Sequence, residues 1–337
     1  MEGRAAPPGI DLAGLTAWLA GLFPDRPVEK PTARLIAGGR SNLTYEIVHC
    51  GQSMVLRRPP LGHVLATAHD MHREYRVLTA LAPTPVPVPQ TFAYCPDETI
   101  IGAPFYLMEK VDGAVYRDSS ALRPLGAQAG QALATALADT LAALHAVDPN
   151  EVGLADFGRP EGFLDRQIRR WRKQLAASYT RPLPGAEELA ERLADTRPDS
   201  GRPAIVHGDF RLDNALVDPA THQINAVLDW EMATLGDPLT DLGLTCVYWD
   251  GLDDLGDSIP PSPGSLPGWP SRADLIARYG GGTHDLDWYV AFAYFKLAVI
   301  LEGIHARYRQ GLTVGEGFSH VGDVVPELFA RGHRTLD

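Results

Sequence analysis

The chain has 337 residues, of which 45% are hydrophobic, and its 30 basic and 42 acidic residues give a formal net charge of −12. This length provides enough apolar side chains for the core of one large domain or of two lobes. The negative charge argues against a nucleic-acid-binding protein, which would need a basic surface. The cysteines, Cys50, Cys95 and Cys246, form no C-x-x-C pair, and this favours a reduced, cytoplasmic compartment.

Neither a secretory signal nor a membrane span is expected. The first apolar run, 12–23, follows Glu2 and Asp11 and has the leucine spacing of an amphipathic helix. The most apolar segment, 288–301, is too short to cross a bilayer and contains Lys296. We therefore expect a soluble protein without a membrane partner.

The first third of the chain reads as strands with two helices. Leucines recur at helical spacing over 12–22, and a second helix is expected over 66–81. Strand patterns occupy the ranges 34–37, 43–50, 53–58, 91–94 and 105–110. The short turn between the first two runs predicts that the second returns beside the first.

A turn of small and polar residues, Gly38-Gly39-Arg40-Ser41-Asn42, separates the first two predicted strands. Gly39 would let the backbone approach a phosphate, and Ser41 and Asn42 could donate hydrogen bonds to it. The glycine pair alone indicates only a hairpin. Neither G-x-G-x-x-G nor a Gly-Lys pair of a P-loop occurs in the chain.

The strand 53–58 presents one arginine on each face. Its alternation places Val55 and Arg57 on the same side, while Arg58 points away. Glu74 is the one charge in an otherwise apolar stripe of the helix 66–81. We predict an ion pair between Arg57 and Glu74, with a solvent-exposed Glu74 as the alternative.

From residue 122 onward the composition becomes helical. A Pro- and Gly-rich loop is expected over 250–270, and Asp237-Pro238 has the pattern of a helix N-cap followed by proline. The expected helices cover 128–145, 163–179, 186–194, 238–249, 273–279, 286–309 and 321–332. The order of the elements along the chain, strands up to about residue 110 and helices after it, predicts two lobes, 1–110 and 111–337.

Two apolar runs in the second lobe each end in polar residues. Residues 205–206 lead into His207-Gly208-Asp209 with Asn214 five positions later, and 226–228 leads into Asp229. In the kinase loop H-R-D-x-x-x-x-N, the Asp accepts the proton of the attacking hydroxyl and the Asn binds Mg²⁺. Asp229 follows its apolar run as the D-F-G Asp does, and can hold the same metal. An isolated Asp–Asn spacing would indicate only a turn and a cap, so the joint pattern carries the inference.

With Leu228-Asp229-Trp230-Glu231 and Gly236-Asp237-Pro238, these residues resemble the aminoglycoside phosphotransferase (APH) family, a branch of the protein-kinase-like fold. The similarity is greatest to the kinase domains that are fused to acyl-CoA dehydrogenases. The resemblance implies an α+β fold of two lobes. An antiparallel-sheet N-lobe would join a helical C-lobe, with ATP and Mg²⁺ bound between them.

The resemblance also implies roles for single residues. Asp209 would be the catalytic base, and Asn214 and Asp229 would be the metal ligands. The expected nucleotide-binding residues form the covering loop, the adenine ceiling, the phosphate-binding pair and the hinge backbone; they are Gly39, Ser41, Asn42, Val55, Arg57, Glu74, Glu109 and Val111.

Supporting roles are expected for several further residues of the second lobe. His207 would brace the catalytic loop, and His145 would be structural. Asp213 is expected to be solvated or capping. Asp237 would cap its helix and, by the resemblance, tie that helix to the catalytic loop.

Five cations fall within eight residues of one predicted helix: Arg166, Arg169, Arg170, Arg172 and Lys173. This cluster is either a solvated face or the contact surface of an anionic acceptor. We expect ATP-dependent phosphorylation of a hydroxyl on a small anionic molecule, such as a hydroxyacyl-CoA, with an acyl-CoA dehydrogenase as a partner in the same pathway. The alternatives are an aminoglycoside or macrolide kinase and a non-catalytic pseudokinase.

Overall fold

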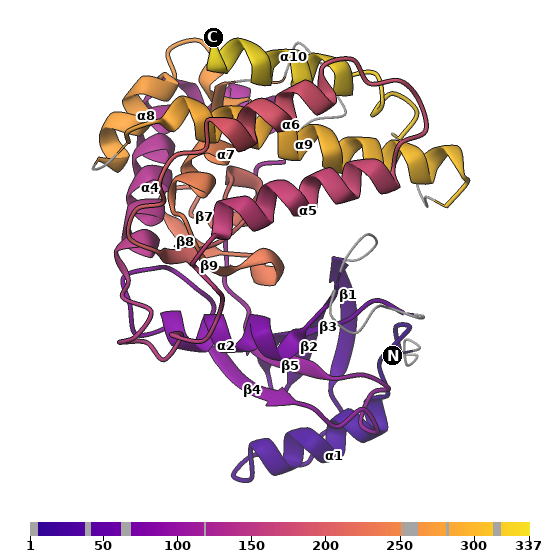
Figure 1. Ribbon diagram of the computed structural model, residues 1–337. Helices are drawn as coiled ribbons and strands as arrows, with labels where there is room; N and C mark the ends of the chain where they lie inside the picture. The colour runs from indigo at the N-terminus through magenta and orange to yellow at the C-terminus, as the bar shows by residue number, and fades with distance from the viewer. Residues whose placement is uncertain are drawn as a thin grey trace. The chain divides into compact units, whose positions relative to one another are not determined.

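The computed structural model describes residues 6–37, 42–61, 69–117, 119–250, 252, 262–280, 283–312 and 318–337. The chain divides into two compact units, Met1–Asp112 and Gly113–Asp337. The boundary lies after Asp112, whereas the sequence placed it after Lys110. The first unit is built on a sheet and the second mainly on helices (Figure 1). This is the expected α+β composition.

The N-terminal unit contains a five-stranded antiparallel sheet with the order β1-β2-β3-β5-β4. Two helices accompany the sheet, α1 (Leu12–Leu22) and α2 (Met71–Leu81). The strands are β1 (Thr32–Ala37), β2 (Leu43–His49), β3 (Gln52–Arg58), β4 (Thr91–Cys95) and β5 (Phe105–Glu109). The strand patterns of the sequence are therefore confirmed within a few residues.

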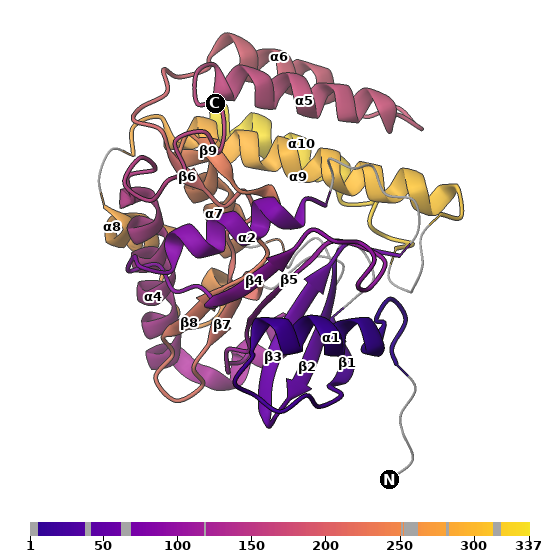
Figure 2. The same ribbon diagram turned by 90° about the horizontal axis from the view of Figure 1, so that it is seen from below.

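Alternation along β3 determines what each face of the sheet carries. Met54 and Leu56 pack into the same core as Leu15 and Leu19 of α1, which lies across β1–β3 (Figure 2). Arg58 shares this face and is buried, donating hydrogen bonds to the carbonyl oxygens of two loop residues outside the sheet. The strand register inferred from the sequence is confirmed, and Arg58 has a structural position.

Helix α2 begins later than the sequence suggested. Asp70 caps it by accepting a hydrogen bond from the backbone N–H of Arg73 (3.0 Å), so the helix starts at Met71. The part of the predicted helix at 66–68 lies outside the described residues. The predicted stripe is buried, and Glu74 within it is only 2% exposed.

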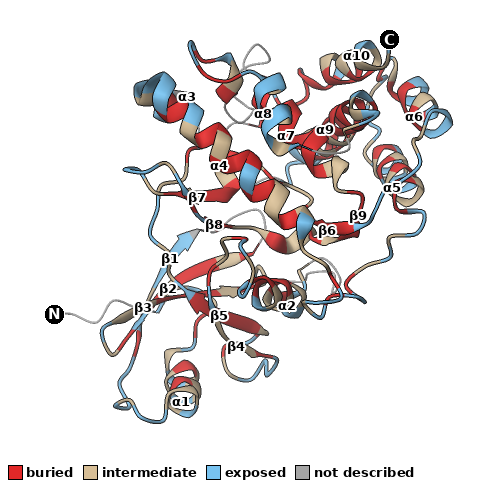
Figure 3. Cartoon of the chain, turned by 90° about the vertical axis from the view of Figure 1, so that its left-hand side faces the viewer, coloured by how far each residue is buried: buried red, intermediate tan, exposed pale blue. Residues whose placement is uncertain are grey.

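The C-terminal unit is organised around α9 (Leu286–Arg309), which contacts four other helices and is buried along most of its length (Figure 3). Length and composition alone would allow α9 to cross a membrane, yet 72% of its apolar window is buried inside the protein, as in a core helix. The other helices are α3 (Ser119–Leu122), α4 (Gly126–Ala146), α5 (Phe163–Ala177), α6 (Ala186–Asp195), α7 (Leu239–Asp250), α8 (Arg272–Tyr279) and α10 (Val325–Leu336). The last helix begins at Val325 rather than at residue 321.

Two small antiparallel ribbons hold the loops that the sequence singled out. Strand β6 (Ala204–Val206) pairs with β9 (Thr234–Gly236), and β7 (Ala215–Val217) pairs with β8 (Ile224–Val227). Strands β7 and β9 were not predicted, because three residues are too few for a periodic pattern. The ribbons fix where the chain leaves β6 and β8.

Asp241 in the first turn of α7 ties that helix to the loop after β6. Its buried carboxylate accepts hydrogen bonds from the backbone N–H groups of His207 (2.6 Å) and Gly208 (2.8 Å). The sequence assigned this tie to Asp237, and that assignment is wrong. Asp237 instead accepts from the N–H of Leu239 and from the hydroxyl of Tyr289, so its oxygens serve the helix end and α9.

Two glycines of α1 offer a matched test of how closely that helix packs in the N-terminal unit. A Cβ on Gly14 would collide with the carbonyl oxygen of Ile100, whereas nothing lies within 4 Å of a Cβ on Gly21. We expect Gly14→Ala to lower the free energy of unfolding by about 1–3 kcal/mol through overpacking. Gly21→Ala should raise it by up to about 1 kcal/mol, because alanine favours the helix. Urea denaturation measures both, and equal effects would contradict the close approach of α1 to Ile100.

A second test concerns Asp241. Burial alone would raise its pKa, but the hydrogen bond and charge of His145 and the contacts of His207 hold the pKa below its ordinary value. Its charge therefore stabilises the fold fully above the ordinary aspartate pKa of about 3.9, and this contribution is lost as the pH falls through the lower folded value. We expect Asp241→Asn to lower the free energy of unfolding at pH 7 by about 1–3 kcal/mol.

The difference between wild type and Asp241→Asn should narrow when urea denaturation is repeated in steps below about pH 4. Asp139 provides the control, because its ion pair with Arg278 is about half exposed. Asp139→Asn should change the free energy of unfolding by less than about 1 kcal/mol. If the difference in free energy of unfolding between wild type and Asp241→Asn stays constant down to pH 2, the proposed role of the Asp241 charge is contradicted.

Candidate functional site

In the N-terminal unit, Arg57 of β3 and Glu74 of α2 form the ion pair that the sequence predicted. Arg57 Nε lies 2.8 Å from Glu74 Oε2. The same carboxylate accepts hydrogen bonds from the hydroxyl of Tyr106 (3.0 Å) and from Nδ2 of Asn42 (2.5 Å). Glu74 is thus a buried anion with several donors, and it fixes the guanidinium in one orientation.

Asn42 is used differently from what the sequence suggested. Its side chain is buried and joins Glu74 to Nδ1 of His69, which lies 2.9 Å from Asn42 Oδ1. The side-chain amide therefore supports the ion pair, and donation to a phosphate by the backbone N–H of Asn42 stays a prediction. Burial and the charge of Arg57 lower the pKa of His69. Gly39 and Ser41, predicted in the same loop, lie outside the described residues.

The predicted nucleotide-binding strand positions are all in place in this unit. Val55 is buried and shares the face of Arg57, and its register partner is Met108 of β5. Glu109 ends β5, where its backbone N–H donates to the carbonyl of Gln90 (2.7 Å). The predicted hydrogen bonds to adenine would use the carbonyl of Glu109 and the N–H of Val111. The bond to Gln90 uses the N–H of Glu109, so it leaves both groups available.

In the C-terminal unit, Asn214 is bonded to Asp209. Asn214 Nδ2 donates to the backbone oxygen (2.8 Å) and to Oδ2 (3.0 Å) of Asp209. These bonds hold the Asp209 carboxylate in place. They also assign the amide nitrogen, which makes Oδ1 the atom of Asn214 that can bind a cation.

Asp229 occupies a sterically disfavoured backbone conformation at the end of β8. Its φ of 65° and ψ of 60° lie in the left-handed region, which residues other than glycine rarely adopt. Such positions persist only where the surrounding contacts impose them, and they cluster at functional sites. The conformation fixes where the carboxylate leaves the chain.

His207 joins the two loops that carry Asp209 and Asp229. The imidazole is fully buried, with Nε2 2.8 Å from the carbonyl oxygen of Leu228. Its Nδ1 accepts a hydrogen bond from the backbone N–H of Asp209 (3.2 Å). Both ring nitrogens are thus used by the backbone, so the sequence-based view of His207 as a brace agrees with its contacts.

The donor set suits a magnesium ion that arrives with a nucleotide. The amide oxygen of Asn214 and the carboxylate of Asp229 are hard oxygen ligands of the kind Mg²⁺ prefers. In the described ranges, no three His, Cys, Asp or Glu side chains gather into a metal site. Mg²⁺ commonly takes one or two protein ligands and completes its shell with phosphates and water.

Arg211 is a charged residue of this loop that the sequence reading did not single out. Its Nε lies 3.3 Å from Asp209 Oδ2 and 2.9 Å from Asp213 Oδ1, and its guanidinium sits 4.9 Å from the ring centre of Tyr248. Asp213 is therefore paired and partly buried. Of the two expected states, solvated or capping, the first is wrong. Burial raises the pKa of Asp213 while Arg211 opposes that shift. The sequence feature that could have identified Arg211 is its position, two residues after Asp209.

Lys296 of α9 is the second residue that the sequence reading left unassigned. Its ammonium donates a hydrogen bond to the carbonyl oxygen of Gly208 (2.5 Å), directly before Asp209. Burial lowers the pKa of Lys296, and the charges of Asp209 and Asp241 oppose this shift. A single cation inside the most apolar run of the chain was the signal that could have marked it.

Comparison with known proteins gives matches over nearly the whole chain. The model of the phosphotransferase enzyme family APH matches residues 32–275. Acyl-CoA dehydrogenase family member 11 of Gallus gallus is 37% identical over 92% of this chain and 41% of its own length. Acyl-CoA dehydrogenase family member 10 of Mus musculus is 37% identical over 81% of this chain and 26% of its own length. The chain thus spans less than half of these relatives.

Solved structures show the same fold. One is a protein from Ralstonia eutropha JMP134 that is named as an aminoglycoside phosphotransferase. Its TM-score is 0.84 at 33% identity, and the match covers 96% of this chain and 98% of that protein's chain. Plasmodium vivax ethanolamine kinase has a TM-score of 0.63 at 12% identity, covering 94% of this chain and 86% of its own. At that identity, the second likeness supports the fold alone.

The family model covers well over half of the chain, and it includes the loops of Asp209, Asn214 and Asp229. The relatives and the structural neighbours agree with the resemblance drawn from the same motifs. The chain therefore belongs to the APH family of phosphotransferase enzymes and has its kinase-like, two-lobe α+β fold.

Proposed function

We propose that this phosphotransferase uses ATP to phosphorylate a hydroxyl group on an anionic small molecule. The observation that carries the proposal is the buried His207, which joins the loops of Asp209 and Asp229 through the backbone of each. A chain that only bound nucleotide would not need a carboxylate positioned for a hydroxyl. The intact set of Asp209, Asn214 and Asp229 therefore disfavours a pseudokinase.

In this mechanism Asp209 accepts the proton of the acceptor hydroxyl while the hydroxyl oxygen forms its bond to phosphorus. Asn214 and Asp229 would hold Mg²⁺, and Arg57, oriented by Glu74, would hold nucleotide phosphates. Bound Mg-ATP supplies the phosphoryl group and the positive charge that stabilises its transfer. The protein contributes orientation and electrostatics, which are the main needs of phosphoryl transfer.

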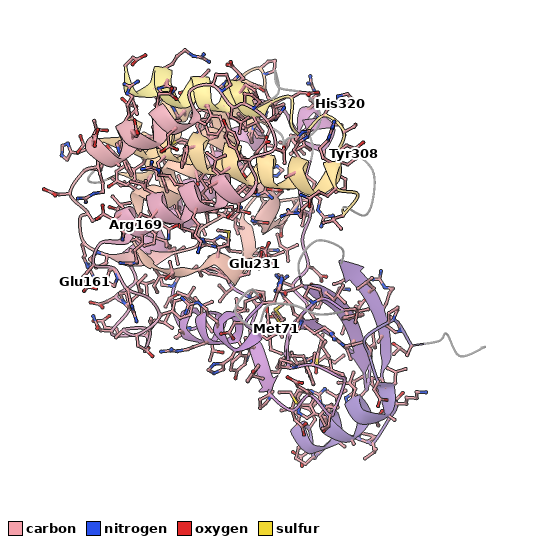
Figure 4. The ribbon with its side chains drawn as sticks, turned by 45° about the vertical axis from the view of Figure 1, so that its right-hand side comes forward. Met71, Glu161, Arg169, Glu231, Tyr308 and His320 are labelled. Carbon is pink, nitrogen blue, oxygen red and sulfur yellow. The ribbon has the colours of Figure 1, made fainter. Side chains whose placement is uncertain are left out.

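The charge of α5 supports an anionic acceptor. Arg172 pairs with Glu187, and Arg166 donates to two backbone carbonyls, so part of the cluster is satisfied within the protein. Within the described ranges, the exposed Arg169, Arg170 and Lys173 have no ion pair. Figure 4 marks Arg169 on this helix. The apolar face of α5, predicted from the sequence, is buried.

The names of the relatives suggest the acceptor class. Matches to acyl-CoA dehydrogenase family members 10 and 11 support a hydroxyacyl-CoA or a related hydroxy acid, with an acyl-CoA dehydrogenase acting in the same pathway. Structural neighbours in complex with kanamycin or hygromycin B support the alternative of an antibiotic kinase. Such polycations call for acidic contacts, which the free cations of α5 do not provide.

Asp209 and Asp229 can be separated by their variants. Asp209→Asn should retain Mg-ATP binding but lower turnover by a factor of about 100 or more, because it removes a positioned base. Asp229→Ala should instead abolish Mg²⁺-dependent nucleotide binding. Calorimetric titration of Mg-ATP and a coupled ADP-release assay measure the two effects.

The control for these variants is Asp139→Asn, an exposed acid of the same unit, which should leave both readouts unchanged. Normal turnover of Asp209→Asn on its best acceptor would refute its role as base. Unchanged Mg-ATP titration by Asp229→Ala would likewise refute its role as metal ligand.

Arg57 should determine the affinity for ATP. Arg57→Met should remove most of the activity and raise the KM for ATP, whereas Arg57→Lys should retain part of the activity, because the charge survives without the planar fork. Thermal melting must accompany the kinetics, because the change leaves Glu74 buried without its cation.

Two other arginines of the same sheet serve as comparisons. Arg34 is largely exposed and pairs with Glu46, so Arg34→Met should have no effect on either readout. Arg58→Met should lower the melting temperature while leaving the KM for ATP unchanged, because Arg58 lies on the other face. A rise in the KM for ATP with Arg58→Met but not with Arg57→Met would contradict the assignment.

A further inference from the structure

Two cations from different helices meet at the ring of Trp171. Helices α5 and α9 pack against each other in the C-terminal unit (Figure 1). Lys296 Nζ of α9 lies 5.7 Å from the centre of the Trp171 ring, and the guanidinium of Arg170 lies 5.2 Å from it. Each of the two cations thus lies within cation–π distance of the same buried indole.

The donors at this position outnumber the acceptors that the protein provides. A lysine ammonium has three N–H groups, and in the described part of the chain Lys296 has the single acceptor Gly208 O and no ion pair. Arg170 is exposed and has neither an ion pair nor a hydrogen bond among the same residues. The buried Nε1 of Trp171 also lacks an acceptor there. Such a surplus of donors suits an anion from outside the protein.

The position of this group relative to the catalytic loop limits what the anion can be. Lys296 contacts the carbonyl of Gly208, and Asp209, the proposed base, is the next residue. The charge of Asp209 also acts on Lys296. An anion held by Lys296 would therefore lie close to the residue that we propose as the base, where the acceptor hydroxyl must also bind.

From these contacts we infer that Lys296 and Arg170, aligned by Trp171, form the subsite that binds the anionic group of the acceptor, a carboxylate or a phosphate. The inference rests on the proposed function for the identity of the reaction. It also assigns different roles to the cations of α5. In the described residues the Trp171 ring has a contact with Arg170 and none with Arg169, so Arg169 is not part of the subsite.

The test compares acceptors that differ only in charge. Straight-chain hydroxy acids are paired with their uncharged amides, and hydroxyacyl-CoAs are paired with the same acyl groups as N-acetylcysteamine thioesters, which lack the phosphates. A preference confined to the first pair identifies a carboxylate as the anion, and one confined to the second pair identifies phosphate. The variants are Lys296→Met, Lys296→Arg and Arg170→Gln, with Arg169→Gln as the matched control.

We expect Lys296→Met and Arg170→Gln each to lower kcat/KM for the anionic acceptor by about tenfold or more, the effect of losing one charge-assisted hydrogen bond. Lys296→Met also removes the bond to Gly208, so it should lower kcat/KM for the uncharged counterparts too, but by much less than for the anionic acceptors, and the KM for ATP should not change. Lys296→Arg should keep most of the preference, and Arg169→Gln should match the wild type. Equal losses on charged and uncharged acceptors would show that Lys296 only supports the loop, and equal effects of Arg169→Gln and Arg170→Gln would indicate general surface charge; either result overturns the subsite.

Calorimetric binding of the same hydroxy acids and thioesters, in the presence of Mg-ADP, separates this inference from the proposed function. If the protein phosphorylates none of the hydroxyl compounds, the proposed function fails. Binding of a charged probe that Lys296→Met weakens and Arg169→Gln does not would still establish the subsite. Binding that is the same in wild type and Lys296→Met would remove the subsite, whatever the outcome for phosphotransfer.

Discussion

The buried carboxylate of Asp241 is the contact on which the rest of the catalytic loop depends. It accepts hydrogen bonds from the two backbone N–H groups that directly precede Asp209, and His145 approaches it from α4. A buried charge is stable only where donors surround it, so these bonds fix the loop against α7. His207 then transmits that constraint to the loop of Asp229, because its ring is bonded to backbone on both sides. The Asp209 carboxylate, the proposed base, is therefore positioned by backbone contacts as well as by its own side-chain partners.

The same principle governs the N-terminal unit. Glu74 is buried on an apolar helix face and is satisfied by Arg57, Tyr106 and Asn42 together. These contacts hold the guanidinium of Arg57 in one orientation, which suits its proposed role of binding phosphate with two parallel N–H bonds. Asn42 contributes through Glu74, so the predicted nucleotide loop and the ion pair are parts of one network.

Acidic and basic side chains lie together around Asp209. The acids are those proposed to bind the metal and accept the proton, and the cations come partly from other elements of the fold. Arg211 lies between the carboxylates of Asp209 and Asp213, and Lys296 approaches from α9. An acidic chain thus places its positive charges locally, where phosphate chemistry needs them. The arrangement is compatible with the proposed anionic acceptor in a protein of strongly negative net charge.

The sequence by itself determined the elements and the residue types of the chemistry. Alternation in β3 predicted that Arg57 and Arg58 lie on opposite faces of the sheet. The apolar stripe of α2 singled out Glu74 as its one charged member. Both inferences depend only on local periodicity. The spacing of Asp209, Asn214 and Asp229 likewise lies within two short loops. Only the tertiary structure decided that Asp241 rather than Asp237 holds the loop, that Asn42 serves Glu74, and that Lys296 reaches Gly208. These contacts join residues far apart in the chain, and no local pattern encodes which buried donor will meet which acceptor.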